Sequence, residues 1–137
     1  MRKLFVNTCD TCAEGSQEFI GNRPESLRPV TEPRARDISE ERDGVADGAA
    51  DYGVLVCGTG IGMAVAANKI HGIRAVNCIT EQFAELAREH NNANIITLSG
   101  RFVELEDNER ILDAFLSTEF GGGRHAGRVE KIMALES

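Results

Sequence analysis

One stretch of sequence decides the fold of this chain: Val54-Leu55-Val56-Cys57-Gly58-Thr59-Gly60-Ile61-Gly62, followed directly by Met63-Ala64-Val65-Ala66-Ala67-Asn68-Lys69-Ile70. The four residues at its start are apolar, and this pattern predicts a buried strand. Residues 58–62, called the glycine turn below, predict a tight connection, and residues 63–70 are good helix formers. Strand, glycine turn and helix in this order form the unit from which parallel α/β sheets are built.

The same alternation of strand and helix patterns continues along the rest of the chain. Short apolar runs predict further strands over residues 4–6, 73–78 and 94–98. Helical patterns cover residues 81–89, 104–116 and 128–135. Because the joints between these elements are short, we expect right-handed crossovers and a mostly parallel sheet. The sequence therefore predicts an α/β domain.

Local chemistry marks two of the expected helix boundaries. Gly72 follows the first helix in the position of a left-handed cap. Thr80 precedes the next helix and is expected to cap its amino end. In that helix we expect Phe83, Leu86 and Ala87 to face the core, because their spacing places them on one side.

Length, composition and charge argue against several classes of protein. The chain has 137 residues, the size of one domain, and 42% of them are hydrophobic, which is enough for a core. Fifteen Lys and Arg against 22 Asp and Glu give a net charge of −7, so nucleic acid is not expected as a partner. No apolar run approaches about 18 residues, and we therefore expect no membrane partner and a cytoplasmic location.

Charge is concentrated in the amino-terminal third of the chain. Residues 13–50 hold fourteen charged side chains, six large apolar ones and all three prolines, whereas residues 51–80 hold ten large aliphatic residues and three charges. The prolines exclude a long helix over residues 21–36, and residues 38–50 predict a short polar helix. We expect a single domain over residues 1–137 in which residues 13–50 are rich in loops.

The cysteines suit a reducing compartment. We expect all four to be reduced, because a domain with an adequate core and no export signal needs no disulfide. Cys9-Asp10-Thr11-Cys12 has the spacing of half a zinc site or of a redox pair. The chain has no second such pair, and its three histidines show no ligand spacing. Two structural thiols are the competing interpretation.

Cys57 and the glycine turn are the first candidates for chemistry. Reactive side chains of open parallel sheets collect at the carboxyl ends of strands, where Cys57 is expected. A thiolate is favoured beside the amides of such a turn, although a small buried side chain is the alternative. The glycine spacing does not fit a nicotinamide fingerprint. The turn either cradles a phosphate or oxyanion on its amides or is a tight connection without further function.

Two polar segments supply further candidates. Glu89-His90-Asn91-Asn92 is expected on a loop, where a histidine is either solvated or catalytic. Gly121-Gly122-Gly123-Arg124-His125-Ala126-Gly127-Arg128 is expected to be a basic loop that either binds a phosphate or is solvated. A base, an anion-binding turn, a histidine and an arginine pair together suit proton abstraction beside a carbonyl on a phosphorylated substrate.

Three motifs carry a resemblance to a known family. They are Cys57-Gly-Thr-Gly-Ile-Gly-Met-Ala-Val-Ala-Ala-Asn-Lys-Ile-His-Gly-Ile-Arg-Ala75, Ala87-Arg-Glu-His-Asn-Asn-Ala-Asn94 and Phe120-Gly-Gly-Gly-Arg-His-Ala-Gly-Arg-Val129. In this order, over residues 52–133, they closely resemble ribose-5-phosphate isomerase B and the related galactose-6-phosphate isomerase subunits. The resemblance implies a Rossmann-like three-layer α/β/α domain with a mostly parallel five-stranded sheet and no metal or other cofactor.

The resemblance also implies an activity and an assembly. The activity is aldose–ketose interconversion of a phosphorylated sugar through a cis-enediolate, with ribose 5-phosphate and ribulose 5-phosphate as the default pair. The assembly is a homodimer or tetramer with the site at the subunit interface. Cys57 would be the base that moves a proton between C1 and C2. The family's alternative base is a glutamate on the following helix, at the position that Met63 occupies here.

The remaining roles are carried over position by position. Thr59 and the amides of the glycine turn, Gly58, Gly60 and Gly62, would hold the enediolate oxygen. His90 would assist ring opening and Asn91 would contact the sugar. The phosphate would be gathered by Arg101, Arg124, His125 and Arg128, some of them across the dimer interface.

The amino-terminal motif departs from the family pattern. The first strand of the family ends in Asp-His, whereas here Asp10 is followed by Thr11. Both are expected to contact substrate, and Thr11 can form a hydrogen bond but carries no positive charge. Two alternatives follow from this change. The substrate is a different sugar phosphate, such as a tetrose, another pentose or a hexose phosphate, or the chain is a catalytically eroded subunit that only binds one.

Overall fold

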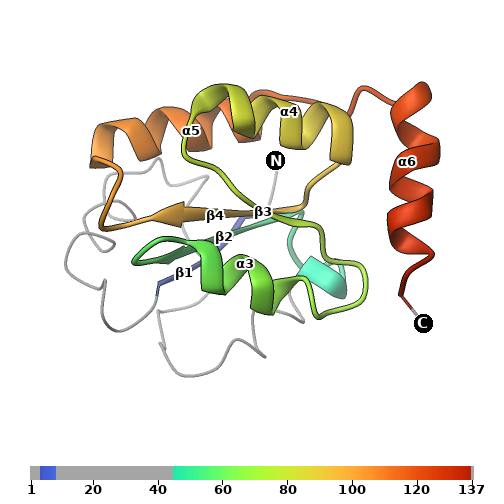
Figure 1. Cartoon of the computed structure of the whole chain (residues 1–137), viewed down its shortest axis with the longest axis horizontal. Coiled ribbons are helices and arrows are strands. Elements are labelled where there is room, and N and C mark those ends of the chain that lie inside the picture. Colours follow the sequence, from blue (N-terminus) through green and yellow to red (C-terminus); the bar gives the residue numbers. More distant parts are fainter. Residues whose placement is uncertain (1–3, 9–44, 137) are drawn as a thin grey trace.

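The computed structural model describes residues 4–8 and 45–136 (Figure 1). Eight elements follow one another along the chain. They are β1 (Leu4–Thr8), β2 (Tyr52–Cys57), α3 (Ile61–Ala67), β3 (Ala75–Asn77), α4 (Glu81–Asn91), β4 (Ile95–Ser99), α5 (Leu105–Ser117) and α6 (Arg124–Met133). The sequence predictions for Cys9, Asp10, Thr11, Cys12 and residues 13–44 lie outside the described residues.

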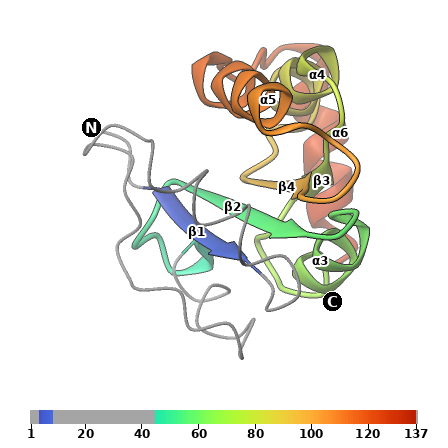
Figure 2. The same ribbon diagram turned by 90° about the vertical axis from the view of Figure 1, so that its left-hand side faces the viewer.

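The strands form one parallel sheet in the order β1-β2-β4-β3. Helix α3 covers one face of the sheet, and α4 and α5 pack side by side on the other (Figures 1 and 2). The predicted Rossmann-like three-layer α/β/α architecture is therefore confirmed. The described residues contain four strands of the five that were expected.

Both faces of β2 are buried, which explains its continuous apolar pattern. Val54 and Val56 pack on the side of α4 and α5, while Leu55 packs with Met63 on the side of α3. A strand covered by helices on both faces has no solvent side and reads as an unbroken apolar run. Cys57 also lies on the α3 side, where it is partly buried.

Several predicted element boundaries were wrong. Helix α3 begins before the predicted stretch and ends at Ala67, with Asn68 as its C-cap. Gly72 does have a left-handed φ of 83°, but it lies in the turn after the helix and does not cap it. Helix α6 begins at Arg124 and not at residue 128.

Helix α4 has the predicted cap but a different buried face. Thr80 Oγ1 accepts a hydrogen bond from the Phe83 amide at 3.2 Å, as expected. Phe83 itself is 54% exposed, however, and Arg88 is 4% exposed. The cause is a polar network at the end of the helix, where the Arg88 guanidinium donates to Tyr52 Oη at 3.0 Å and to the Ala93 carbonyl at 2.6 Å. This network turns the Arg88 side of α4 toward the sheet.

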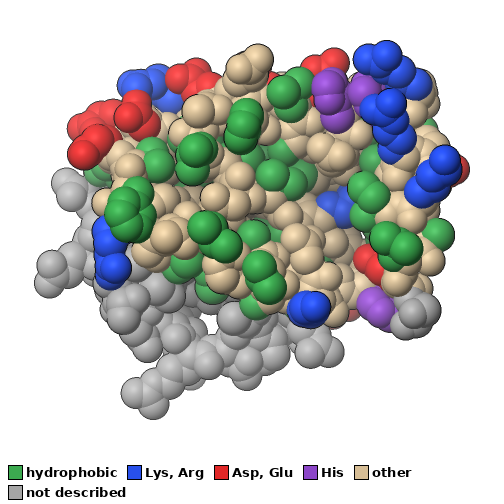
Figure 3. Space-filling view, in the orientation of Figure 1, with side chains coloured by type: hydrophobic (Ala, Val, Ile, Leu, Met, Phe, Trp, Pro, Cys, Tyr) green, Lys and Arg blue, Asp and Glu red, His purple; other side chains and the backbone are tan. Residues whose placement is uncertain are grey.

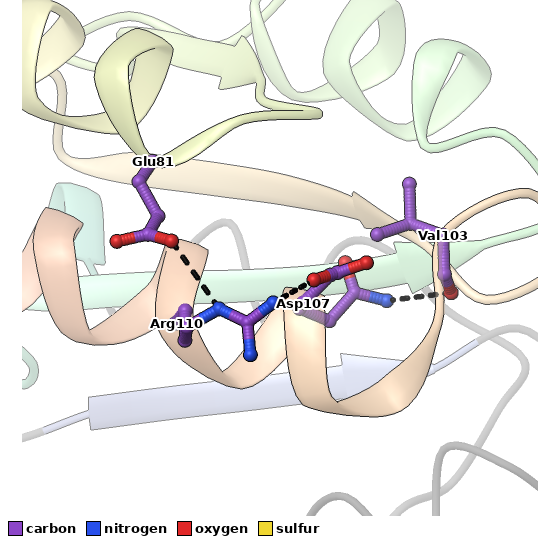
Figure 4. Close-up of polar contacts among 5 residues, drawn as sticks. Glu81, Val103, Asp107 and Arg110 are labelled. Atoms are coloured by element: carbon purple, nitrogen blue, oxygen red, sulfur yellow. Dashed lines mark hydrogen bonds and ion pairs between the residues drawn. The ribbon is translucent and has the colours of Figure 1, made fainter.

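Charged side chains connect α4 and α5 on the outer surface. Arg110 of α5 pairs with Asp107 on its own helix and with Glu81 at the start of α4, the latter at 3.3 Å (Figure 4). The buried Asn108 side chain donates to the Val103 carbonyl at 3.3 Å and to the Ser99 carbonyl at 2.7 Å.

In the part of the chain that the structure describes, no helix is long and apolar enough to cross a membrane.

Candidate functional site

Cys57 ends β2 and faces the glycine turn, as the sequence predicted. Its Sγ accepts a hydrogen bond from the Gly60 amide at a distance of 3.1 Å. The side chain is partly exposed, so a ligand at the carboxyl edge of the sheet can reach it. Negative charge on this sulfur is stabilised by the amide that points at it.

The backbone carbonyls of the glycine turn are bonded to the protein. The Gly58 carbonyl accepts from Ser99 Oγ at 2.7 Å and from the Arg101 amide at 3.2 Å. The Gly60 carbonyl accepts from the Ala64 amide at 3.2 Å. These bonds hold the Gly58 and Gly60 carbonyl oxygens on the protein side. Of the amides of the turn, that of Gly60 donates to Cys57 Sγ, and the Thr59 hydroxyl accepts a hydrogen bond from the Ile61 amide at 3.1 Å.

Glycine is required at one position of the turn. Gly60 has φ 83°, a value that side chains of L-residues disfavour. A Cβ at this position would collide with Asn77 Nδ2 and lie 3.0 Å from the Leu98 carbonyl oxygen. Gly62, in contrast, has open space around the position of a Cβ.

Arg101 belongs to the same edge of the sheet as Cys57. Its guanidinium carbon lies 3.8 Å from the position that a Cβ on Gly58 would occupy. The side chain is exposed and brings a positive charge next to the glycine turn. Of the four residues expected to gather a phosphate, this is the one that the structure places beside the expected base.

The other three phosphate candidates lie on α6, and one of them, His125, stacks on His90. The rings of His90 and His125 lie parallel, with centroids 4.2 Å apart and planes 10° from each other. Arg124, His125 and Arg128 share α6, and Figure 3 shows histidine side chains and side chains of the Lys or Arg type gathered over the start of this helix. We call His90, Arg124, His125 and Arg128 the His–Arg cluster.

Two loop predictions are corrected here. His90 and Asn91 lie in the last turn of α4 and residues 124–128 in the first turns of α6, so these parts are helical, whereas Asn92 and residues 121–123 lie outside the helices as expected. The loop prediction for residues 124–128 rested on the three glycines that precede Arg124. The helix begins there because the Gly121 amide donates to the Glu89 carbonyl at 2.9 Å and His125 packs on His90, contacts that no local pattern shows.

His125 is buried next to His90, Arg124 and Arg128. The residue is 8% exposed, and its Nδ1 has no hydrogen-bond partner among the described residues. Burial lowers the pKa of His125, and the neighbouring His90, Arg124 and Arg128 lower it further, while Glu89 acts in the opposite direction. An anion bound in the cluster would compensate these positive charges.

One copy of the chain does not bring Cys57 and the His–Arg cluster together. Cys57 pairs with Ser99 at the carboxyl edge of the sheet, whereas the end of α4 leads into Ile95 at the amino edge. Four strand residues separate these two levels, which is about 13 Å. Figure 1 shows α6 far from the turn that precedes α3.

Asn91 lines a cavity of about 410 Å³. Arg74, Asn68, Ile132 and Glu136 are among the other lining residues. The cavity lies between the edge strand β3 and α6. Asn91 directly follows His90 in α4 and lies at the same edge of the sheet as the His–Arg cluster.

Sequence reasoning missed two polar residues at the carboxyl edge of the sheet. Ser99, which was read only as a strand end, is 1% exposed and holds the Gly58 carbonyl. Asn77 ends β3 and donates to the Thr59 carbonyl at 3.0 Å. The available signal was that each is a polar residue directly at the end of a strand, as Cys57 is.

The second described cysteine does not share the chemistry of Cys57. Cys78 is fully buried, and burial raises the pKa of its thiol to about 12. Both described cysteines are free. Within residues 4–8 and 45–136, no group of three or more His, Cys, Asp or Glu side chains is arranged to hold a metal ion.

Comparison with known proteins gives a family match and close structural similarity. The model of the family described as Ribose/Galactose Isomerase matches residues 37–132. The solved structure of ribose-5-phosphate isomerase B from Mycoplasma genitalium with bound ribulose 5-phosphate is similar, with a TM-score of 0.80 and 34% identity. That similarity covers 97% of this chain and 95% of the other.

Two curated relatives show higher identity over a shorter stretch. Ribose-5-phosphate isomerase B of Escherichia coli is 49% identical over 92 residues, which are 67% of this chain and 62% of the relative. D-erythrulose-4-phosphate isomerase of Pectobacterium atrosepticum is 47% identical over 88 residues, which are 64% of this chain and 58% of the relative. These matches span less than two thirds of the length of the curated relatives.

Proposed function

Because the chain belongs to the ribose/galactose isomerase family, we propose that it interconverts the aldose and ketose forms of a phosphorylated sugar, with ribose 5-phosphate and ribulose 5-phosphate as the first pair to test. One observation carries the proposal. A partly exposed thiol, Cys57 Sγ, lies at the carboxyl edge of a parallel sheet and accepts the Gly60 amide at 3.1 Å. The relatives named as ribose-5-phosphate isomerase B support this substrate pair.

In the proposed reaction, Cys57 as thiolate removes the proton from C2 of the open-chain aldose. The electrons of that C–H bond form the C1–C2 double bond, and the carbonyl oxygen at C1 becomes negatively charged, which gives a cis-enediolate. A proton then moves from the C2 hydroxyl to the oxygen on C1, the C2–O bond becomes a carbonyl, and return of the first proton from Cys57 to C1 yields the ketose. Amides of the glycine turn and the Thr59 hydroxyl would stabilise the enediolate oxygen, in the manner of an oxyanion hole. Met63 offers no carboxylate that could replace the thiol.

The phosphate would be bound by arginines at two edges of the sheet. Arg101 lies beside Cys57, whereas the His–Arg cluster lies at the far edge of the same copy. We therefore propose that a second copy of the chain places its His–Arg cluster, and with it the neighbouring Asn91, next to Cys57. His90 would assist ring opening and Asn91 would contact the sugar.

Exposed apolar side chains support such an assembly, either a homodimer or a tetramer. They lie on α3 and around the start of α4, and each is more than half exposed: Ile61, Val65, Ile79 and Phe83. Figure 3, in the orientation of Figure 1, shows hydrophobic side chains across the middle of the side of the molecule that faces the viewer. Apolar surface of this kind is typical of contacts between protein chains.

A panel of phosphorylated aldoses tests the substrate. Turnover should be highest with ribose 5-phosphate, and the relative named D-erythrulose-4-phosphate isomerase makes a tetrose phosphate the second candidate. Erythrose 4-phosphate, other pentose phosphates and hexose phosphates complete the panel. If the protein bound these sugars but converted none of them, it would be a sugar-phosphate-binding subunit and not an isomerase.

The proposed location is the cytoplasm, which relatives that are metabolic enzymes support.

A further inference from the structure

Asn77 lies directly beneath the glycine turn, at the end of the edge strand β3. Its Nδ2 donates to the Thr59 carbonyl at 3.0 Å, to Thr97 Oγ1 at 3.1 Å and, at 3.4 Å, to the Thr97 carbonyl. Backbone carbonyls only accept hydrogen bonds, so the NH₂ group of the amide must face the turn. The absent Cβ of Gly60 leaves the space in which this NH₂ group lies.

One peptide unit connects Asn77 to Cys57. The carbonyl of the Thr59–Gly60 peptide accepts from Asn77, and the N–H of the same peptide donates to Cys57 Sγ at 3.1 Å. This peptide is trans, so its C=O and N–H point in opposite directions. When Asn77 holds the Thr59 carbonyl oxygen in place, the Gly60 N–H on the other side of the peptide must therefore point toward Cys57 Sγ.

We propose that Asn77 is a positioning residue that orients the Thr59–Gly60 peptide so that its N–H points at the Cys57 sulfur. The kinetic consequence rests on the proposed function, whereas the effect on the thiol does not. Asn77 touches neither the sulfur nor the expected position of the sugar. It acts through the backbone of the turn.

The turn needs such a residue because its own sequence does not fix the peptide. Glycine adopts left-handed and right-handed φ values with similar ease, and Gly60 is held at φ 83°. A rotation of the Thr59–Gly60 peptide would turn the carbonyl oxygen toward Cys57 in place of the N–H. An oxygen lone pair facing the sulfur repels a thiolate. A donor beneath the turn removes this alternative, because rotation would break its hydrogen bond.

A purely structural role for Asn77 is the competing explanation, since its bond to Thr97 Oγ1 also connects β3 to β4. A matched control separates the two roles. Asn68 is another amide that is anchored on β3: its Nδ2 donates to the Ala75 carbonyl and its Oδ1 accepts from the Ala75 amide, both at 2.8 Å. It lies at the amino end of β3, away from Cys57. Asn68→Leu therefore removes a comparable strand anchor without touching the turn.

The test is the pH dependence of Cys57 alkylation by iodoacetamide in the folded protein, followed by mass spectrometry of the peptide that contains Cys57. Asn77→Leu keeps the branched heavy-atom skeleton of the side chain, with somewhat larger methyl groups, but removes the donor. We expect it to move the midpoint of the profile upward by about 0.5 to 1 pH unit, the effect of losing one hydrogen bond to the thiolate. Asn77→Asp should move it at least as far, because a carboxylate cannot donate to Thr59. Asn68→Leu should lower the melting temperature and leave the midpoint unchanged.

Isomerase kinetics provide the second measurement. With ribose 5-phosphate, Asn77→Leu should lower kcat about 3- to 10-fold and leave KM nearly unchanged, because ground-state contacts with the sugar are retained. The proposal is overturned if both Asn77 variants keep the wild-type alkylation profile, or if Asn68→Leu moves it equally. Should Asn77→Leu not fold, the near-isosteric Asn77→Asp decides. A protein that isomerises no sugar but shows the shifted profile would refute the proposed function and leave the role of Asn77 intact.

Discussion

His90 and His125 stack face to face, with ring centroids 4.2 Å apart, although they come from the end of α4 and the start of α6. Arg124 and Arg128 lie on the same helix as His125. Two imidazole rings in contact, beside two guanidinium groups, disfavour further positive charge. The arrangement is therefore suited to receive a dianion, and the four side chains act as one group.

The first prediction concerns pH and stability. The pKa of folded His125 is lowered by burial and then by His90, Arg124 and Arg128. Below about pH 6.5 the unfolded chain therefore takes up a proton that the folded chain does not, and stability falls as the pH falls through this window. We expect the melting temperature to drop between about pH 7.5 and about pH 5.5.

Two comparisons check this prediction. Inorganic phosphate should protect more strongly at the lower pH, because a bound anion favours the protonated ring. His125→Gln should reduce both the pH effect and the protection. The exposed His71 provides the control, and His71→Gln should behave as the wild type. An equal loss of the pH effect in both variants would show that the cluster is not its source.

The second prediction concerns the assembly of the site. Cys57→Ala and Arg128→Ala should each be inactive alone. When the two are mixed and allowed to exchange subunits, one site of each mixed dimer combines an intact Cys57 with an intact His–Arg cluster. About a quarter of wild-type activity should then return, because half of the dimers are mixed and each carries one complete site. Activity that stays at the sum of the two variants would contradict a site shared between copies.

The third prediction concerns the glycine turn. Gly60→Ala forces a Cβ into φ 83° and against Asn77, and we expect a loss of about 1 to 3 kcal/mol in the free energy of unfolding. Gly62→Ala lies within α3, where a Cβ meets nothing within 4 Å. It should leave stability unchanged or raise it by about 0.5 to 1 kcal/mol. Urea denaturation of both variants measures the difference, and equal losses would refute the assigned close approach at Gly60.

The fourth prediction concerns the two described cysteines. Burial raises the pKa of Cys78 to about 12, and its side chain is inaccessible. At about pH 8 iodoacetamide should label Cys57 and spare Cys78 in the folded protein. In denaturant both should react at similar rates. Labelling of Cys78 under native conditions would show that the core around β3 and α4 opens readily.

Local sequence patterns predicted the part of the site that is continuous in sequence. Strand β2, the glycine turn and Cys57 follow each other directly, so their chemistry is visible in one window. Thr80 was predicted correctly for the same reason, since its cap involves the nearby Phe83 amide. In such segments backbone preference and hydrogen bonding act within a few residues.

Contacts between distant segments could not be predicted in this way. Arg88 is buried because Tyr52, 36 residues earlier, accepts from its guanidinium. The early start of α6 depends on the packing of His125 against His90. The role of Asn77 becomes visible only when the glycine turn is seen to lie over the end of β3. Each of these required the positions of two segments in space.

Deuterium exchange at C2 of the sugar tests the central claim, that Cys57 is the base of an aldose–ketose isomerase. In D₂O the wild-type protein should introduce deuterium into the ribose 5-phosphate and ribulose 5-phosphate pool, as followed by proton NMR. Cys57→Ala should slow this exchange about 10²- to 10⁴-fold and keep the wild-type melting temperature. Exchange at the wild-type rate in Cys57→Ala would contradict the claim.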